Sequence, residues 1–251
     1  MATGPQQKRK DLREKRLKAE AQADGSDRRQ NMSKVVGIAA FLAVIAVAAI
    51  VIVSQSGSDE PSKESGDVDK LLAGIPQDGS VLGDPGAPVT LVEFADLQCP
   101  ACQAASETII PDVISGPVKS GKASYEFNNW AILGSDSTTA AKAALAASEQ
   151  NLMQQFVENF YANQGRENSG YVTDDFLKDI AEKAGIPDMD KWEADRDLPK
   201  WDQVLLEVDN QAIDSSFTGT PTFAIKNADG SLDQIDARSA DDIIRAINQA
   251  Q

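Results

Sequence analysis

The two cysteines of the chain, Cys99 and Cys102, are the feature that most constrains its fold. They form a Cys-Pro-Ala-Cys motif shortly after an apolar run, Val89–Phe94, that is typical of a buried strand. Proline is tolerated in the first turn of a helix, so Cys99 is predicted to begin one, with Asp96–Gln98 as the tight connection before it. The free amides and positive dipole end at a helix start stabilise a thiolate, the reactive form of cysteine. The stretch therefore predicts a strand, a turn and a helix that carries a reactive thiol.

The Cys-x-x-Cys spacing alone has other interpretations. A zinc site takes about four ligands, usually cysteine or histidine; the chain has no histidine and no third cysteine, so only carboxylates could complete such a site. A purely structural disulfide over so short a loop would constrain the unfolded chain little. We therefore favour dithiol/disulfide exchange, in which Cys99 is the nucleophile and Cys102 resolves the mixed disulfide, and we expect no metal or organic cofactor.

Two segments carry a resemblance to a known family. The run Val89–Gln103 (VTLVEFADLQCPACQ) and the later segment Phe217–Ile225 (FTGTPTFAI) resemble the thioredoxin superfamily and, within it, the DsbA-like thiol:disulfide oxidoreductases. The resemblance covers about Asp78 to Gln251. It implies an α/β, thioredoxin-like fold with an inserted helical subdomain.

The resemblance also implies roles for three residues outside the motif. In that family an acid six residues before the first cysteine is buried behind the disulfide, and a threonine and a cis-proline face it; these positions are Glu93, Thr220 and Pro221 here. Glu93 would accept the proton of Cys102, and Thr220 and Pro221 would face an extended substrate. From the residues alone, Glu93 could instead lie on an exposed edge, and proline is ordinary at the first position of a strand. Asp96 and Gln98 have only the interpretation of polar loop residues.

One position departs from the DsbA pattern. Ala101 stands between Pro100 and Cys102, where the best-known members have histidine. Alanine offers the Cys99 thiolate neither a charge nor a side-chain donor. We therefore expect a Cys99 pKa and a reduction potential between those of thioredoxin (about 7 and about −270 mV) and DsbA (about 3.5 and about −120 mV).

The N-terminal charge pattern predicts a membrane anchor. Residues 1–34 carry a net charge of +5 and the remaining residues −20, and between the charged parts lie nineteen uncharged residues, Val35–Val53. Nineteen helical residues span about 28 Å, close to the hydrocarbon thickness of a bilayer. A cleaved signal peptide is the alternative, but its apolar region would be shorter and no clear cleavage site follows Val53. The basic tail would stay cytoplasmic and the acidic part would face outward.

Composition divides the rest of the chain. Residues 54–77 are rich in Ser, Gly, Asp and Glu and are interpreted as a flexible linker between the anchor and a domain at 78–251. The pattern from about 131 to 215 is helical and interrupts the strands, as the helical insertion of DsbA-like proteins does. Strands return at Thr222–Lys226 and Leu232–Ile235, and a closing helix is predicted at Ala240–Ala250.

These observations predict an extracytoplasmic thiol:disulfide oxidoreductase that is anchored in the membrane by one helix. Disulfide formation in reduced substrate proteins or peptides is the favoured reaction, and a membrane quinone-linked partner would then reoxidise the enzyme. A reductase or isomerase of the same fold, or a peptide-binding module without turnover, are the alternatives. A nucleic-acid role is not expected, because the basic tail lacks aromatic residues and lies beside the membrane.

Overall fold

The computed structural model describes residues 65–251. The predicted basic tail (1–34), membrane span (35–53) and first part of the linker lie outside the described residues. Within residues 65–251, no helix has both the length and the apolar character needed to cross a membrane. The elements are α3 (Ser65–Leu72), β1 (Gln77–Asp78), β2 (Val81–Leu82), β3 (Val89–Ala95), α4 (Pro100–Thr108), α5 (Ile110–Val113), a π-helical turn (Ile114–Val118), β4 (Ala123–Asn129), α6 (Ser135–Ser148), α7 (Met153–Ala162), α8 (Asp174–Lys183), α9 (Met189–Asp195), α10 (Lys200–Asp214), β5 (Thr222–Lys226), β6 (Leu232–Ile235) and α11 (Ala240–Gln249).

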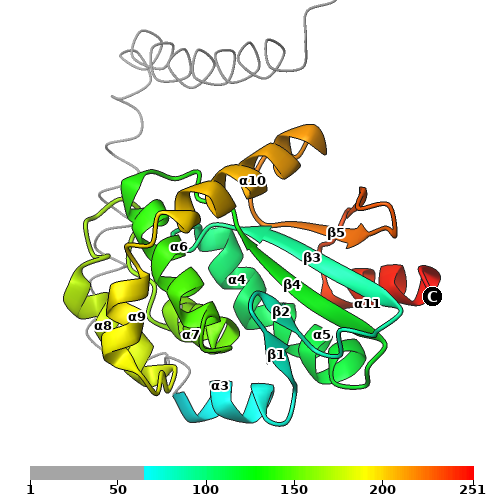
Figure 1. Cartoon of the computed structure of the whole chain (residues 1–251). Helices are drawn as coiled ribbons and strands as arrows, with labels where there is room; N and C mark the ends of the chain where they lie inside the picture. The colour runs from blue at the N-terminus through cyan, green and yellow to red at the C-terminus, as the bar shows by residue number, and fades with distance from the viewer. Residues whose placement is uncertain (1–64) are drawn as a thin grey trace, which may run out of the picture. The chain divides into compact units, whose positions relative to one another are not determined.

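The strands form one sheet in the order β1-β2-β4-β3-β5-β6 (Figure 1). β3 and β4 are parallel, and the other pairings are antiparallel. β3 lies between two strands, and Glu93 in its middle is opposite Phe127 on one side and Phe223 on the other. The apolar run that predicted a buried strand is therefore the centre of the sheet.

Alternate residues of the central strands pack on two different layers of helices. On one side, Leu91 and Tyr125 belong to the main core with residues of α4, α5, α7 and α11. On the other side, Val92 and Phe94 pack with Val208 of α10 and with its neighbours. Figure 1 shows α10 along one side of the sheet and α4, α5 and α11 on the other. Because side chains of a strand alternate in direction, Glu93 is directed to the same side as Leu91.

The predicted strand, turn and helix around the cysteines are present, and the helix that follows Cys99 is interrupted near Pro111. α4 ends at Thr108, and α5 begins at Ile110 with Pro111 in its first turn. Proline lacks the amide that would continue the helical hydrogen bonds, so a new short helix starts there. The two strands predicted after the insertion are also present, and β5 and β6 pair as a hairpin across the turn Asn227–Gly230, where Asn227 N donates to Ser231 O (2.8 Å).

The helical insertion is confirmed. Five helices, α6 to α10, separate β4 from β5 along the chain. Thr173 caps α8, with its hydroxyl accepting from Phe176 N (3.2 Å). Trp192 is fully buried and packs against Phe156, so the aromatic residues at helical spacing form a core here. The insertion thus has its own apolar centre, continuous with the main core.

The linker prediction for residues 54–77 is wrong in its second half. α3 occupies Ser65–Leu72, and Val68 and Leu72, one turn apart, are 1% and 4% exposed. These side chains join the main core, and α3 packs against α7. Burying each contributes about 1.5–3 kcal/mol. Local composition was too polar to predict this helix, because its stability comes from tertiary contacts that the window does not contain. The folded domain therefore begins before Asp78.

Candidate active site

The two cysteines lie at the start of α4 in very different surroundings. Cys99 is the N-cap residue, with an extended backbone (φ −73°, ψ 120°), and Pro100 follows at the first helical position. The Cys99 carbonyl accepts from Cys102 N and Gln103 N, each at 3.1 Å, and these bonds close the first turn of the helix. Cys99 is 7% exposed, whereas Cys102 is fully buried. The helix start therefore leaves Cys99 slightly exposed at the edge of the core and places Cys102 fully within it.

Donors around Cys99 favour its thiolate. The pKa of Cys99 is lowered to about 6, chiefly by a hydrogen bond from the Cys102 thiol and further by the Thr220 side chain and the amides of Cys102 and Ala101; partial burial opposes this. The Cys99 thiol also lies 3.5 Å from the carbonyl oxygen of Thr220, whose bond to Pro221 is cis. The segment Thr220–Pro221 therefore lies against the first sulfur. A value near 6 falls between the pKa values of about 7 and about 3.5 expected to bracket it.

Cys102 has the opposite shift. Burial raises its pKa far above the ordinary thiol range, and the hydrogen bond to Cys99 and the charges of Glu93 and Cys99 raise it further. The backbone amide of Asp96 acts in the other direction and favours the thiolate. Cys102 is therefore a neutral thiol at rest, and any reaction of its sulfur needs a partner for its proton.

Glu93 is buried in the centre of the sheet on the side of the dithiol. It is 2% exposed, so the alternative of an exposed edge is wrong. Its pKa is raised to about 8, first by burial and then by the charges of Glu158 and Cys99, while a hydrogen bond from the Tyr125 hydroxyl opposes the rise. At neutral pH Glu93 is therefore mainly a neutral acid that can give a proton to a buried base, and its smaller ionised fraction can take a proton from a buried acid.

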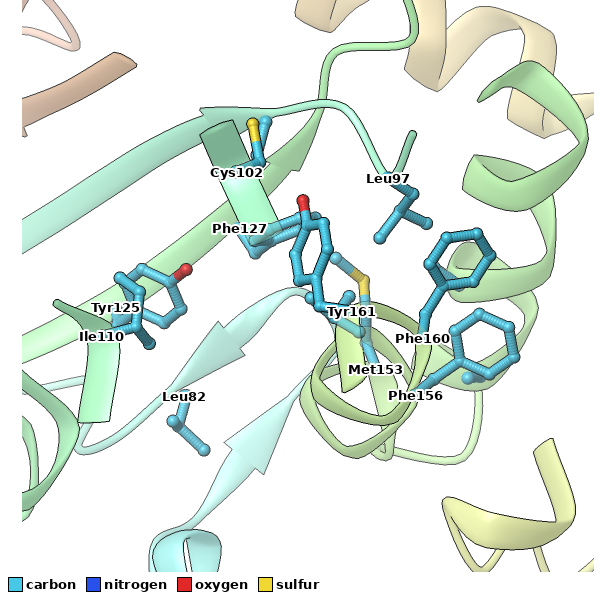
Figure 2. Packing of buried hydrophobic residues seen from close by; sticks show 14 of the residues in the cluster. Leu82, Leu97, Cys102, Ile110, Tyr125, Phe127, Met153, Phe156, Phe160 and Tyr161 are labelled. Atoms are coloured by element: carbon cyan, nitrogen blue, oxygen red, sulfur yellow. The ribbon is translucent and has the colours of Figure 1, made fainter. Parts of the chain in front are cut away.

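The sequence did not identify the residues that form the floor beneath the dithiol. Figure 2 shows Cys102 with Phe127 and Tyr161 in the buried cluster, and Tyr125 beside them. Burial raises the pKa of both tyrosine hydroxyls, and the Glu93 charge contributes to each shift. Both hydroxyls are therefore neutral donors. In the sequence, both tyrosines have the pattern of ordinary core residues, and no signal distinguished them from other buried aromatic residues.

A second buried carboxyl group, Glu158, lies on α7. Its two oxygens accept from Ser106 Oγ (2.8 Å) and Gln154 Nε2 (3.0 Å). Ser106 lies one turn after Cys102 on α4, so this contact joins the active-site helix to the insertion. Glu158 is a charged residue in a helix whose other residues are mostly buried. A buried charged side chain needs hydrogen-bond partners, and this requirement was the signal that could have pointed to it.

Asp96 and Gln98 are not ordinary loop residues. They are 1% and 0% exposed, and both side chains bond to Ser137 of α6. The interpretation from the sequence was wrong because their partners lie about forty residues later in the chain.

The zinc alternative gains no ligands from the fold. Such a site would need about two groups besides the cysteines. In the described part of the chain, residues 65–251, no group of three or more Cys, Asp or Glu side chains is placed to hold a metal ion. The candidate site is therefore the dithiol with the acid behind it and the Thr220–Pro221 segment in front.

A family model described as "Thioredoxin" matches residues 77–248. The chain belongs to the thioredoxin family. Among curated proteins, the "Probable disulfide bond formation protein D" of Bacillus cereus is 32% identical over 119 residues, which are 47% of this chain and 55% of that protein. The chain thus spans about half the length of the curated relatives it matches.

Solved structures of this family share the fold. The oxidised BdbD of Bacillus subtilis superposes with a TM-score of 0.60 at 22% identity, covering 70% of this chain and 96% of that one. The alpha-DsbA1 of Wolbachia pipientis gives 0.59 at 22% identity, covering 73% and 95%. The expected DsbA-like architecture, a thioredoxin fold with a helical insertion, is therefore confirmed.

Proposed function

We propose that this thioredoxin-family protein is a thiol:disulfide oxidoreductase that forms disulfides in substrate proteins through Cys99 and Cys102. The observation that carries the proposal is the opposite shift of the two thiol pKa values, one lowered to about 6 and the other raised far above its usual range. A thiol of low pKa is a good leaving group, and a stabilised thiolate favours the reduced form of the motif. Both effects drive electrons from substrate to protein. The curated relatives are named disulfide bond formation proteins, which supports this direction.

The first step begins from the Cys99–Cys102 disulfide. A substrate thiolate attacks Sγ of Cys99, the bond between the two protein sulfurs breaks, and Cys102 leaves with the electron pair. A buried thiolate is costly, so the neutral Glu93 supplies the proton that Cys102 requires. The product is a mixed disulfide between Cys99 and the substrate.

The second step releases the oxidised substrate. Another substrate thiolate attacks the substrate sulfur of the mixed disulfide, and Cys99 leaves as a thiolate that the donors at the helix start stabilise. The substrate has lost two electrons and two protons. The protein has gained the two electrons and one proton on Cys102, and the other proton goes to solvent at pH values above about 6. Running backward, the same residues perform reduction, with Cys102 resolving and Glu93 accepting its proton.

The remaining assignments extend this scheme. The Thr220–Pro221 segment, beside the Cys99 sulfur, is proposed to contact the extended substrate. The uncharged run Val35–Val53 after a basic tail supports a single membrane anchor with the domain on the extracytoplasmic side. The reduced protein then needs an electron acceptor, and a membrane quinone-linked partner would fit an anchored domain.

A stoichiometric assay tests the function. The oxidised protein is mixed with a reduced dithiol peptide, and peptide disulfide and protein thiols are counted. We expect one peptide disulfide for each protein disulfide consumed, and no reaction with Cys99→Ser. A protein that binds the peptide but leaves its thiols unchanged would instead be a peptide-binding module.

A further inference from the structure

The short turn between β3 and α4 is built by Asp96. Its carboxylate oxygen Oδ1 accepts from Gln98 N (2.8 Å), and its carbonyl accepts from Cys99 N (2.9 Å). These two bonds close the turn locally and fix where the helix begins. The position of both sulfurs relative to the sheet therefore depends on this turn.

The same carboxylate ties the turn to the helical insertion. Oδ2 accepts from the amides of Ile132 (2.8 Å) and Leu133 (2.9 Å), and Oδ1 also accepts from Ser137 Oγ (2.7 Å). The Asp96 carbonyl receives a further bond from the Tyr161 hydroxyl (3.2 Å). A buried carboxylate with four donors is satisfied without a cation.

Two side chains of the neighbouring segments repeat this connection. Gln98 donates to Ser137 Oγ (2.9 Å) and accepts from Asn168 N (3.0 Å). Gln164 donates to the carbonyls of Leu97 (2.7 Å) and Cys99 (3.2 Å). Every residue of the turn is therefore bonded to the insertion, and Asp96 holds the largest share of these contacts.

The turn also sets where the helix that carries both sulfurs begins. The Asp96 carbonyl accepts from Cys99 N (2.9 Å), and the Cys99 carbonyl accepts from Cys102 N (3.1 Å). The Asp96 backbone also opposes the rise in the Cys102 pKa that burial causes. The side chain of Asp96, by holding the turn, thus fixes the start of α4.

We propose that Asp96 is a positioning residue for the dithiol: its carboxylate fixes the turn to the helical insertion and so fixes the start of α4, which carries the sulfurs of Cys99 and Cys102. The proposal rests on the proposed function only in giving Cys102 a role in exchange. An acid is required, because each oxygen accepts from two donors, so the amide nitrogen of asparagine would face two of the four donors in either orientation. The insertion is thereby coupled to the reactivity of the resolving cysteine.

The test uses a step that needs no protein substrate. A mixed disulfide of Cys99 with glutathione is prepared, and its resolution is followed: the Cys102 thiolate attacks Sγ of Cys99, and glutathione leaves as a thiolate. Alkylation of Cys99 in the reduced protein is measured separately. We expect Asp96→Asn to slow resolution roughly tenfold or more, as for a hydrogen bond to a charged group, while alkylation of Cys99 changes less than about twofold. Ser137→Ala removes one of the four donors and should slow resolution by a smaller factor.

A matched control separates positioning from general loosening. Asp209 accepts from Trp130 Nε1 (3.2 Å) and so joins the residue that follows β4 to α10, on the opposite side of the sheet. Asp209→Ala should lower Tm and leave resolution unchanged. Resolution at the wild-type rate in Ser137→Ala, or equal slowing in Asp209→Ala, would overturn the proposal, and Ser137→Ala decides the matter alone if Asp96→Asn does not fold. A wild-type protein that resolves glutathione but oxidises no peptide would refute the proposed function without touching this inference.

Discussion

The two cysteines lie in two regions with opposite effects on a thiol. We call the region around Cys99 and Thr220 the mouth, and the buried region around Cys102 and Glu93 the floor. At the mouth, Cys99 lies at a helix start beside Thr220, and its pKa falls to about 6. At the floor, Cys102 is buried above the centre of the sheet near Glu93, and its pKa rises far above the thiol range. The two residues are one helical turn apart. Their difference shows that exposure and nearby donors, more than position in the motif, decide which sulfur reacts first.

The two regions also come from different parts of the chain. The mouth is built by the local start of α4 and by the loop before β5. The floor is built by β3 and β4, together with α7 of the insertion. A change at the mouth should therefore alter attack and leaving-group ability, and a change at the floor should alter proton transfer and resolution.

Removing the floor sulfur should have the largest effect. In Cys102→Ala the Cys99 thiolate still attacks a substrate disulfide, but nothing within the protein resolves the product, so mixed disulfides should accumulate nearly quantitatively. Non-reducing electrophoresis measures them. Cys99→Ala should trap almost none, because the remaining sulfur is fully buried. Similar trapping by both variants would break the distinction between mouth and floor.

The floor should also make stability depend on pH. Because the folded pKa of Glu93 is raised from 4.5 to about 8, its contribution to stability is complete below pH about 4.5 and is lost as pH rises to about 8. The loss is at most about 5 kcal/mol. The oxidised protein lacks the Cys99 thiolate, the smallest of the causes that raise the Glu93 pKa. We therefore expect its unfolding free energy to fall over a similar range, and that of Glu93→Gln to fall much less. Denaturant unfolding at several pH values measures it, and the exposed Glu207→Gln should behave as the wild type.

The oxidised form is chosen because Cys99 opposes this trend in the reduced protein. Its lowered pKa contributes stability that is present above the unfolded thiol pKa and is lost as pH falls through about 6. Between pH about 6 and about 8 the two groups therefore act in opposite directions. An oxidised protein with pH-independent stability would show that Glu93 is not the neutral acid described.

The rates of the two exchange steps should also separate the mouth from the floor, with a smaller effect than the changes above. Glu93→Gln keeps the shape of the side chain but cannot exchange a proton, so resolution by Cys102 should slow by about 10²-fold. Attack by Cys99 should remain nearly unchanged, and stopped-flow measurement of each step shows the difference. Tyr125→Phe removes the bond that lowers the Glu93 pKa, so the pH midpoint of resolution should move upward. Equal slowing of both steps would contradict this division.

The smallest effect is expected from a charge added at the mouth. Ala101 is exposed in the first turn of α4, and Ala101→His would supply a donor to the Cys99 thiolate. The reduction potential should rise by tens of millivolts, at about 30 mV per 1.4 kcal/mol for a two-electron couple. Equilibration with glutathione measures it. Ala104→His, exposed on the same helix but farther along, is the control; an equal rise there would assign the effect to general charge.

The mouth was largely predictable and the floor was not. The strand, the turn and the helix that begins at Cys99 are contiguous, so their residues carried the signal. The burial of Glu93 follows only when β4 and β5 pair on both sides of β3, and the sequence left that open. The family resemblance, not the strand pattern, pointed to the acid.

The sequence also failed to identify buried polar residues whose hydrogen-bond partners lie far along the chain. Asp96 looked like a loop residue because its donors Ile132, Leu133 and Ser137 are far along the chain. Glu158 meets the active-site helix through Ser106, more than fifty residues earlier. Periodicity describes one element at a time, so it cannot show which buried polar groups will find each other.

The most direct test of the account is the pH dependence of thiol alkylation in the reduced protein, with the labelled cysteine identified by mass spectrometry. The account predicts that Cys99 reacts with a midpoint near pH 6, while Cys102 stays unmodified across the neutral range. A Cys99 midpoint near the ordinary value of about 8.5, or equal labelling of both cysteines, would contradict the central claim that mouth and floor hold the two sulfurs in opposite states.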